Sequence, residues 1–558
     1  MQVGLKLRSV AAVIAATTLA WACGGGGGGL TNLAKEQTLR INQGVEPGSL
    51  DPGQTQWNYE AGIDRNISEA LLKGSADLKD VVPAAAESYT VSSDGLTYTF
   101  KLRKNAKYSD GQPVKAQDFV YSWQRLIDPR LAAPYADFFS GSVKGGEEAA
   151  ALDPKKDASK IDAALQGLGL KAVDDYTFQV TLPTAQGYFK WIATLWNGAP
   201  IRKDVIDKYG SDKWWTKPET LITNGPFKVS EIVAKDHITM VPNTNYWGYT
   251  SGSYKPNLTK IVSYEIDDEN AAFAKYQNGE LEMVGVPLAN TQLVKNDPKL
   301  SKELHSVPEG SMFWLYFNTA KAPFTNVKVR QAFAKGVDRN AYVNDILQGR
   351  AVASSTFIPK GSGGYAQDSL GSIQAFDAAA AKQLLADSGV PQSQLNSIHY
   401  LVRNTPTNKQ VAEFIQGQFK TNLGINVTID LIDSKTVSKR LRTGDYQLAG
   451  AGGWLLDYPD QQDWFDIFRT GDGNNFDKWS NKQYDDLVKQ ADSTTDQKKR
   501  DDLYLQAHKI LVTDAPVAFM YQRLTFGLRK PYVAGIVSTS LDDWPGDLYV
   551  SKIYITTH

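Results

Sequence analysis

Cysteine is almost absent from this chain: Cys23 stands alone among 558 residues. A disulfide framework is therefore excluded, and packing must stabilise the fold. Histidine is scarce too, since the five residues of this type never form an H-x-x-x-H pair. Neither a Gly-Lys-Ser/Thr phosphate loop nor a G-x-S-x-G elbow occurs. Triad and metal-hydrolase chemistry need such groups, so we expect no catalytic residue, no metal and no cofactor. The spacing of residues in the sequence does not exclude an enzyme that uses a Ser/Lys pair or two carboxylates.

An excess of one charge and a long apolar run are also missing. Lys and Arg total 60 against 61 Asp and Glu, a net charge of -1, so nothing indicates nucleic-acid binding. The apolar run at 10–20, after Lys6 and Arg8, has about half the length of a membrane-spanning helix. A charged start, a short apolar core and small residues at the exit indicate a signal peptide over 1–22 and an exported protein.

Two cleavage sites fit the end of this signal. Ala20-Trp21-Ala22 is an A-x-A site for ordinary signal peptidase. The stretch 19–23 (LAWAC) alternatively resembles a lipoprotein box, in which Cys23 is acylated and becomes the mature N-terminus. The glycine run that follows favours the second interpretation, because 23–32 would form a flexible tether. We expect a protein of the periplasm or cell envelope, lipid-anchored through Cys23.

The rest of the chain, about 530 residues, is long enough for two or three domains and indicates a mixed α/β fold. Alternation predicts strands at 38–42, 96–102, 170–173 and 176–182. Helices are predicted at 378–387, capped by Asp377, at 411–422, and over 481–512 with a break near 493–495. A strand at 425–432 follows the second helix after Gly424. The abundant aromatics (13 Trp, 26 Tyr, 21 Phe) suit both a large core and a ring-lined cleft.

Several motifs occur in the order known from one protein family. The stretches 86–89 (AESY), 94–103 (DGLTYTFKLR) and 107–123 (KYSDGQPVKAQDFVYSW) resemble the signature of the peptide-binding proteins of ABC importers, solute-binding protein family 5. The likeness is greatest to the oligopeptide-binding branch. Further matches run along the chain at 49–52 (SLDP), 128–129 (DP), 133–136 (APYA), 223–225 (TNG), 245–247 (NYW), 321–324 (KAPF), 327–330 (VKVR), 337–339 (VDR) and 453–458 (GWLLDY).

The resemblance implies a two-lobed periplasmic-binding-protein fold of type II, with three domains and hinge closure on the ligand. Carried over, the first lobe (domain I) takes 33–67, 196–307 and 525–558. The extra domain (domain II) takes 68–195, and the second lobe (domain III) takes 308–524. Closure of two lobes suits an exported binder, because it buries the ligand.

A protein that binds peptides of any sequence must hold what all peptides share: backbone amides, the α-ammonium and the carboxylate. The resemblance implies that Asp457 pairs with the α-ammonium. Gly453, Trp454 and Leu455 then supply a backbone ladder and a site wall. It also implies that Tyr135 lines the site and that the loop with Gln56 and Asn58 contacts the ligand from the first lobe.

Three positions depart from the family pattern. Leu455 stands where close relatives carry a cysteine, so their disulfide cannot form. The glycine-rich stretch 450–453 replaces an arginine used for some peptide C-termini, and Asn408 replaces a histidine. Arg442, or Arg440, and Asn408 are therefore the candidates for the ligand carboxylate.

We expect a monomeric extracytoplasmic solute-binding protein, not an enzyme, that captures short peptides and delivers them to an inner-membrane ABC permease. Murein peptides remain an alternative ligand. Nickel chelates are another, although no histidine cluster supports a metal. An exported peptidase or chaperone on the same fold is the alternative from a different class.

Overall fold

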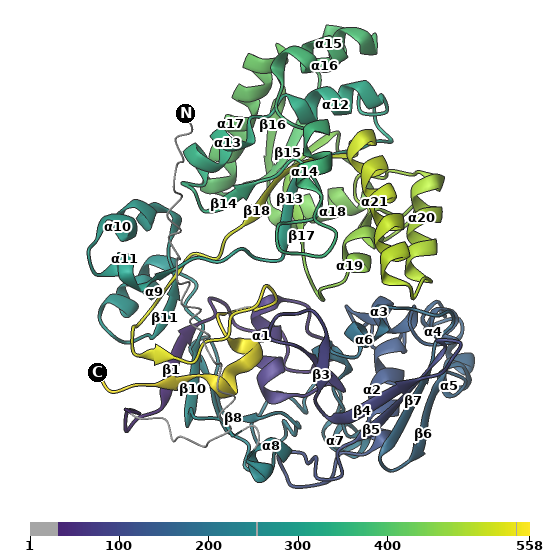
Figure 1. Ribbon diagram of the computed structural model, residues 1–558, viewed down its shortest axis with the longest axis vertical. Helices are drawn as coiled ribbons and strands as arrows, with labels where there is room; N and C mark the ends of the chain where they lie inside the picture. Colours follow the sequence, from purple (N-terminus) through teal and green to yellow (C-terminus); the bar gives the residue numbers. More distant parts are fainter. Residues whose placement is uncertain (1–31, 253–254, 543) are drawn as a thin grey trace, which may run out of the picture.

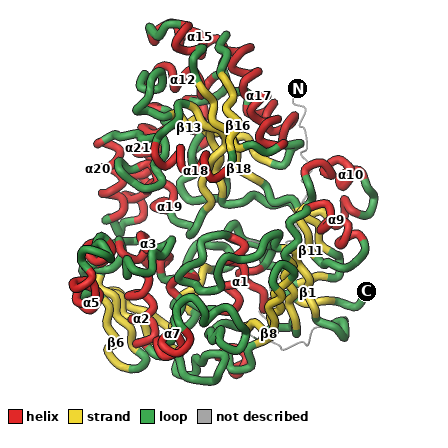
Figure 2. The backbone as a smooth tube through the Cα atoms, turned by 180° about the vertical axis from the view of Figure 1, so that it is seen from behind, coloured by secondary structure: helices red, strands yellow, loops and turns green. Residues whose placement is uncertain are grey.

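The computed structural model describes residues 32–252, 255–542 and 544–558. The predicted signal peptide, Cys23 and nearly all of the tether lie outside these residues. Figure 1 shows two bodies stacked along the long axis, with a sheet-and-helix lobe above and a wider body of two sheets below; Figure 2 shows the same division from behind.

The wider body contains a seven-stranded sheet built from distant parts of the chain. The strand order is β12-β19-β11-β1-β10-β9-β8. These strands are β1 (Thr38–Asn42), β8 (Phe227–Val233), β9 (His237–Pro242), β10 (Lys260–Tyr264), β11 (Met283–Gly285), β12 (Leu304–His305) and β19 (Gly527–Arg529). Helices α1 (Asn58–Ile67), α7 (Lys203–Tyr209), α9 (Glu269–Gln277), α10 (Thr291–Asn296) and α11 (Leu300–Glu303) accompany them. All seven strands fall within the ranges predicted for the first lobe.

A four-stranded antiparallel sheet forms the other part of this body, in the order β4-β5-β7-β6. Its strands are β4 (Ala86–Val91), β5 (Thr97–Leu102), β6 (Leu170–Asp174) and β7 (Thr177–Thr181), and a short ribbon of β2 (Leu72–Gly74) and β3 (Val81–Pro83) lies nearby. The accompanying helices are α2 (Ala116–Ile127), α3 (Ala136–Ser140), α4 (Gly146–Ala150), α5 (Ala158–Gln166) and α6 (Phe189–Ile192).

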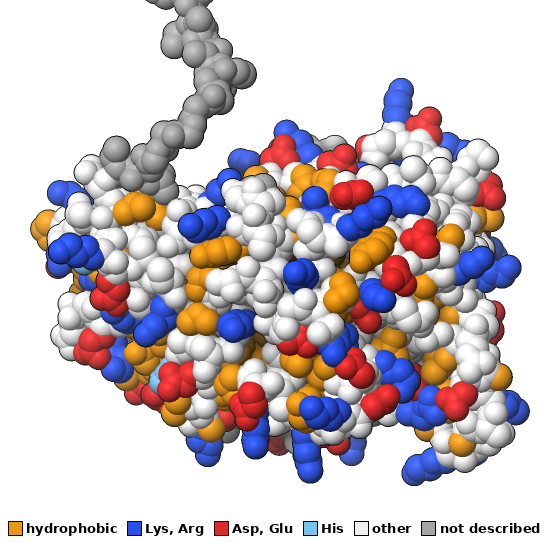
Figure 3. All heavy atoms as spheres, turned by 90° about the horizontal axis from the view of Figure 1, so that it is seen from below, with side chains coloured by type: hydrophobic (Ala, Val, Ile, Leu, Met, Phe, Trp, Pro, Cys, Tyr) orange, Lys and Arg blue, Asp and Glu red, His pale blue; other side chains and the backbone are white. Residues whose placement is uncertain are grey.

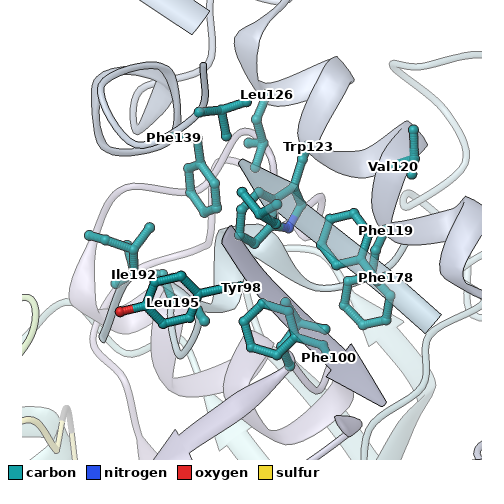
Figure 4. Close-up of a cluster of buried hydrophobic side chains, with 14 of the residues drawn as sticks. Tyr98, Phe100, Phe119, Val120, Trp123, Leu126, Phe139, Phe178, Ile192 and Leu195 are labelled. Atoms are coloured by element: carbon teal, nitrogen blue, oxygen red, sulfur yellow. The ribbon is translucent and has the colours of Figure 1, made fainter. Parts of the chain in front are cut away.

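Aromatic rings fill the space between α2 and this sheet (Figure 4). Trp123 is fully buried, and its ring meets Phe139 and Phe178 edge-on, with centroids 5.0 and 5.5 Å away. Its indole N–H donates to the carbonyl of Gly198 at 3.0 Å, so the buried ring leaves no polar group without a partner. This core supports α3 and the residue before it, Tyr135.

The upper lobe is built on a six-stranded mixed sheet in the order β14-β18-β13-β17-β15-β16. Its strands are β13 (Ser311–Phe317), β14 (Ala351–Ala353), β15 (His399–Arg403), β16 (Thr428–Ile432), β17 (Leu448–Leu455) and β18 (Val517–Arg523). Its principal helices are α12 (Val327–Lys335), α15 (Ala378–Ser388), α17 (Pro406–Leu423), α18 (Ser434–Thr443), α19 (Gln461–Phe465), α20 (Lys482–Asp492) and α21 (Gln497–Asp514). All six strands fall within 308–524, although the domain limits themselves stay a prediction.

Two stretches of chain connect the lobes, one from β12 to β13 and one from β18 to β19, and they cross side by side in Figure 1. They pair with each other through an antiparallel bridge between Pro308 and Leu524. Thr525 N donates to the carbonyl of Val307 at 2.8 Å, and Glu309 N donates to that of Arg523 at 3.0 Å. This narrow double connection is the hinge that a two-lobe closure needs.

The predicted elements are present, and the two largest shifts are at the starts of one helix and one strand. The helix predicted at 411–422 begins at Pro406, because Thr405 Oγ1 accepts the N–H of Asn408 at 3.2 Å and Pro406 occupies the first turn. The strand predicted at 425–432 begins at Thr428, where parallel pairing with His399 begins. Residue Ile425 instead donates its N–H to Phe419 at the end of α17.

Charge and hydropathy agree with the composition. Cationic and anionic side chains are interspersed on the face in Figure 3, without a large area of one sign. Among the described residues no helix is long and apolar enough to cross a membrane. Among the described tryptophans, Trp123, Trp214, Trp314 and Trp464 are fully buried, whereas Trp57 is 54% exposed. Much of the aromatic content therefore serves the core.

Candidate functional site

The end of β17 has a strand partner on one side only. On that side β13 pairs with it throughout, from Phe317–Leu448 to Ser311–Leu455. On the other side β15 pairs with it at Leu448 and Ala449 and then diverges. Within the described ranges, 450–455 has no strand partner along this second edge. An unpaired edge presents backbone donors and acceptors to an incoming extended chain.

Glycine is required at this edge because rings cover the strand. A Cβ on Gly452 would lie 2.1 Å from the ring of Tyr316, and one on Gly453 would lie 2.4 Å from the carbonyl oxygen of Met312. A Cβ on Gly450 would lie 3.0 Å from the hydroxyl of Tyr400. The glycine-rich stretch is thus explained by close packing within the second lobe.

Asp457 lies two residues beyond the end of this strand, at the boundary between the lobes. Its Oδ1 accepts a hydrogen bond from the hydroxyl of Tyr135 at 2.7 Å, which joins the second lobe to the extra domain. Burial raises the pKa of Asp457 to about 6, while the Tyr135 hydroxyl and the Arg65 charge oppose that rise. The carboxylate is therefore mainly ionised at neutral pH, in a place that favours a cationic partner.

The residue after Asp457 fixes this boundary. Tyr458 is fully buried and belongs to the hydrophobic core of the extra domain, although it follows a strand of the second lobe. Its ring meets that of Phe138 edge-on, with centroids 5.8 Å apart. The turn that carries Asp457 is therefore held by packing on both sides of the cleft.

A cavity of about 80 Å³ lies beside Asp457 and draws its walls from both lobes and the hinge. From the first lobe come Asn58, Arg65 and Trp196, and from the second come Leu455 and Asp457. The hinge contributes Glu309, Gly310, Arg523 and Thr525, and the C-terminal segment contributes Ser540, Leu541 and Asp542.

Arg65 is the cation of the first lobe in this wall. Its Nη1 donates to the carbonyl of Leu541 at 2.7 Å and lies 3.6 Å from a carboxylate oxygen of Asp547. Its guanidinium also lies over the ring of Trp196, 4.8 Å from the centroid. Arg65 is thus tied to its own lobe, so its charge compensates Asp457 only in part.

A larger cleft of about 1020 Å³ opens on the other side of Leu456. It lies between the extra domain, which supplies Tyr98, Lys190 and Trp191, and the second lobe, which supplies the glycine-rich loop 361–364 and Arg500. Leu456 and Ser540 line both spaces. The region around Asp457 therefore has room for ligand groups of several sizes.

The structure brings together most of the predicted site residues. Asn58 and Leu455 line the cavity with Asp457, and Tyr135 contacts that carboxylate directly. Gly453 and Trp454 lie on the unpaired edge of β17. Gln56 is exposed just before α1, and its backbone N–H donates to Glu60 at 2.9 Å.

The two candidates for the ligand carboxylate lie elsewhere. Arg442 is exposed in the last turn of α18, and Asn408 is half-buried in the first turn of α17. Neither is among the residues lining the cavity beside Asp457. Arg440 is tied to Asp445, with its Nε 2.8 Å from the backbone carbonyl.

Sequence reasoning missed Arg65, Trp196, Arg523 and Asp463, which all lie at or directly behind the site. Arg65, Trp196 and Arg523 lie far along the chain from 453–457, and nothing in their local sequence sets them apart, whereas Asp463 follows this stretch closely. Asp463, an acid between Gln462 and the apolar pair Trp464-Phe465, carries the only local signal. As to metals, no group of three His, Cys, Asp or Glu residues in the described part of the chain is placed to hold an ion.

Comparison with known proteins identifies the family. The model for bacterial extracellular solute-binding proteins, family 5 Middle, matches residues 80–476. The oligopeptide-binding protein OppA of Bacillus subtilis (strain 168) is 30% identical over 548 residues, covering 96% of each chain. The heme-binding protein A of Haemophilus influenzae is 28% identical over 571 residues, covering 96% of this chain and 97% of its own.

A solved structure shows the same architecture. That of the Escherichia coli murein tripeptide binding protein MppA superimposes with a TM-score of 0.77 at 28% identity, covering 95% of this chain and all of that one. These relatives are named for oligopeptides, murein tripeptide and heme, so family membership alone does not identify the ligand of this chain. The two-lobed architecture, the hinge and the near-complete coverage together place this chain among the bacterial extracellular solute-binding proteins of family 5.

Proposed function

We propose that this protein captures short peptides outside the cytoplasmic membrane and delivers them, chemically unchanged, to an ABC permease. The observation that carries the proposal is the unpaired edge of β17 leading to the half-buried carboxylate of Asp457 between two lobes. An edge of this kind can take a peptide as an added strand, whatever its side chains. The carboxylate then pairs with the one cation that every unblocked peptide carries.

The roles of the surrounding residues follow from their positions. Gly453, Trp454 and Leu455 would hydrogen-bond the peptide backbone from the second lobe. Asn58 and Gln56 would contact it from the first lobe, and the Tyr135 hydroxyl would orient the carboxylate of Asp457. The partner of the ligand carboxylate stays a prediction, with Arg442 and Asn408 as its candidates.

Location and assembly form a further part of the proposal. The family description is extracellular, and the predicted signal and lipoprotein box agree with export and acylation of Cys23. We therefore infer a lipid-anchored monomer of the cell envelope that contacts the permease in the inner membrane. A flexible glycine tether would leave both lobes free to move.

Mass spectrometry of the natural ligand tests this function. The protein is purified from its own cells and denatured, and the released small molecules are identified. Intact short peptides support the proposal, and peptides of cell-wall composition select the murein alternative. Release of heme or of any other non-peptide ligand would overturn it. Fragments of a defined peptide, found after that peptide is incubated with the protein, would also overturn it, in favour of a peptidase.

A further inference from the structure

A second carboxylate, the fully buried one of Asp463, lies directly behind the unpaired edge. Asp463 belongs to the short helix α19 and is 2% exposed. Its Oδ2 accepts two hydrogen bonds, one from the indole N–H of Trp454 at 3.1 Å and one from the backbone N–H of Asp457 at 3.1 Å. One oxygen atom therefore ties the ring at the strand end to the acid that follows it.

These two bonds fix the short stretch from Trp454 to Asp457 on one side. On the other side, the N–H of Leu456 donates to the carbonyl of Gly310 at 2.7 Å. The stretch is thus held between α19 and the start of β13. Asp457 lies beyond the end of β17, so the hydrogen bonds of the sheet do not fix its position. The bonds to Asp463 and Gly310 therefore decide where its carboxylate points.

We propose that Asp463 is the positioning residue of this site: it holds Trp454 and Asp457 in one geometry, so that the unpaired edge and the cation-binding carboxylate face the same ligand. This inference rests on the proposed role of Asp457. Asp463 itself does not face the ligand space, because it is buried and lines neither the cavity beside Asp457 nor the larger cleft.

A neutral hydrogen-bond acceptor could take the place of the Asp463 carboxylate. Burial and the nearby charge of Asp457 both raise the pKa of Asp463 well above its usual range. Two neutral N–H groups donate to it, and no cation of the described residues is in hydrogen-bond contact with its oxygens. An asparagine carries the same carbonyl acceptor on a side chain of the same shape, so it should replace Asp463.

The experiment measures how strongly the protein distinguishes trialanine from N-acetyl-trialanine, as the ratio of their dissociation constants by calorimetry. We expect Asp463→Ala to reduce this ratio about tenfold, since a displaced charge-assisted bond loses much of its strength. Asp463→Asn should keep the ratio within about threefold of the wild-type value, because the asparagine carbonyl can accept the same two hydrogen bonds. The matched control is Asp477, a buried acid of the same lobe whose side chain accepts the backbone N–H of Trp479 at 3.1 Å. Asp477→Ala should leave the ratio unchanged.

An unchanged ratio in Asp463→Ala would overturn the proposal, as would an Asp463→Asn variant that fails as badly as the alanine. If Asp463→Ala does not fold, Trp454→Phe removes one of the two donors and should reduce the ratio about threefold; an unchanged ratio there overturns it too. Asp457→Ala separates the two ideas. If Asp457→Ala keeps the wild-type ratio, the proposed ammonium site is wrong. If Asp457→Ala brings the ratio close to one while Asp463→Ala leaves it unchanged, only the positioning role is wrong.

Discussion

The carboxylate of Asp457 is desolvated and yet has open space beside it. Burial penalises its charge, and the cavity beside it has walls from both lobes. A buried carboxylate is costly without a partner, and Tyr135 supplies a neutral hydrogen bond while Arg65 is shared with Asp547. A ligand ammonium would complete its compensation.

The first prediction concerns Asp457→Ala. Removing one member of a buried charge pair typically costs about 2–5 kcal/mol, which corresponds to roughly 30-fold to several thousand-fold weaker binding of a tripeptide. N-acetylation of the peptide should cost the wild type a similar amount. Calorimetry on all four combinations checks whether both changes act on one contact, because the acetyl group should then cost the variant much less. Additive losses would mean that Asp457 acts elsewhere, as a turn residue before Pro459.

The second prediction concerns pH. The raised pKa of Asp457, about 6, means that a proton must leave this acid before an ammonium can pair with it. Affinity for trialanine should therefore rise between pH 5 and pH 7 and then level off, with binding at pH 5 about tenfold weaker. The stability of the ligand-free protein should change in the opposite direction. An acid whose pKa is raised in the folded state contributes stability that is lost as the pH rises through that pKa.

Calorimetry across this range checks the pH prediction, and Asp457→Asn is the control. The groups facing Asp457 are Tyr135, Arg65 and Asp463, and burial raises the pKa of Tyr135 and of Asp463 well above their usual ranges. The asparagine variant should thus bind weakly with a flat profile. A wild-type profile that is flat from pH 5 to pH 7 would contradict the assignment.

At the scale of single elements, β17 shows how a strand is adapted to its place. Its glycines lie under the rings of Tyr316 and Tyr400, so the strand passes close beneath them. Gly417, in contrast, lies in α17 with nothing within 4 Å of an added Cβ. The same substitution should thus have opposite effects in the two elements.

The third prediction compares these two glycines. Gly452→Ala should destabilise the second lobe by about 1–3 kcal/mol, because the buried Tyr316 ring must move to admit the methyl group. Gly417→Ala should stabilise it by about 0.5–1 kcal/mol, since alanine restricts the unfolded chain and favours the helix. Urea titrations followed by tryptophan fluorescence measure both. Equal effects would contradict the packing described for β17.

At the scale of the whole molecule, the hinge sets the range of motion. Two chain segments connect the lobes. The hydrogen bond between Tyr135 and Asp457 also joins the two sides of the cleft. Any ligand that touches both sides binds one arrangement of the lobes better than the others. It shifts their equilibrium by that difference in affinity.

The fourth prediction is that saturating peptide makes the molecule more compact. Small-angle scattering should give a smaller radius of gyration with trialanine than without it, because the lobes rotate about the hinge. Asp457→Ala at the same peptide concentration should keep the ligand-free radius. Superimposable curves for the wild type with and without saturating peptide would indicate a rigid site.

The fifth prediction concerns the place of the protein in the cell. If Cys23 is acylated, the wild type should partition with membranes, because several acyl chains bind far more firmly than one. Cys23→Ser should be found in the soluble fraction. Fractionation of cells carrying each form provides the measurement. A wild type found wholly in the soluble fraction would favour cleavage after Ala22 by ordinary signal peptidase.

Local sequence determined the individual elements well. Asp377 begins α15 with its side chain accepting the N–H of Ala380 at 2.9 Å, and Gly389 ends it with a positive φ of 69°. The break near 493–495 separates α20 from α21. These signals depend on residues within one or two turns of each other, so they can be read without the fold. The family, too, could be inferred from motif order, because collinear motifs span nearly the whole chain.

Tertiary structure alone decided how the site is assembled. Tyr135 and Asp457 are 322 positions apart, and Arg65 and Trp196 also come from distant parts of the chain. Their meeting depends on the packing of Tyr458 into the extra domain and on the hinge, which no local pattern encodes. Asp463 is the plainest case: the sequence shows an acid in a short helix, and only the fold shows that it holds Trp454 and Asp457. Burial and hydrogen bonding between distant segments are properties of the folded chain, so a site made from them appears only there.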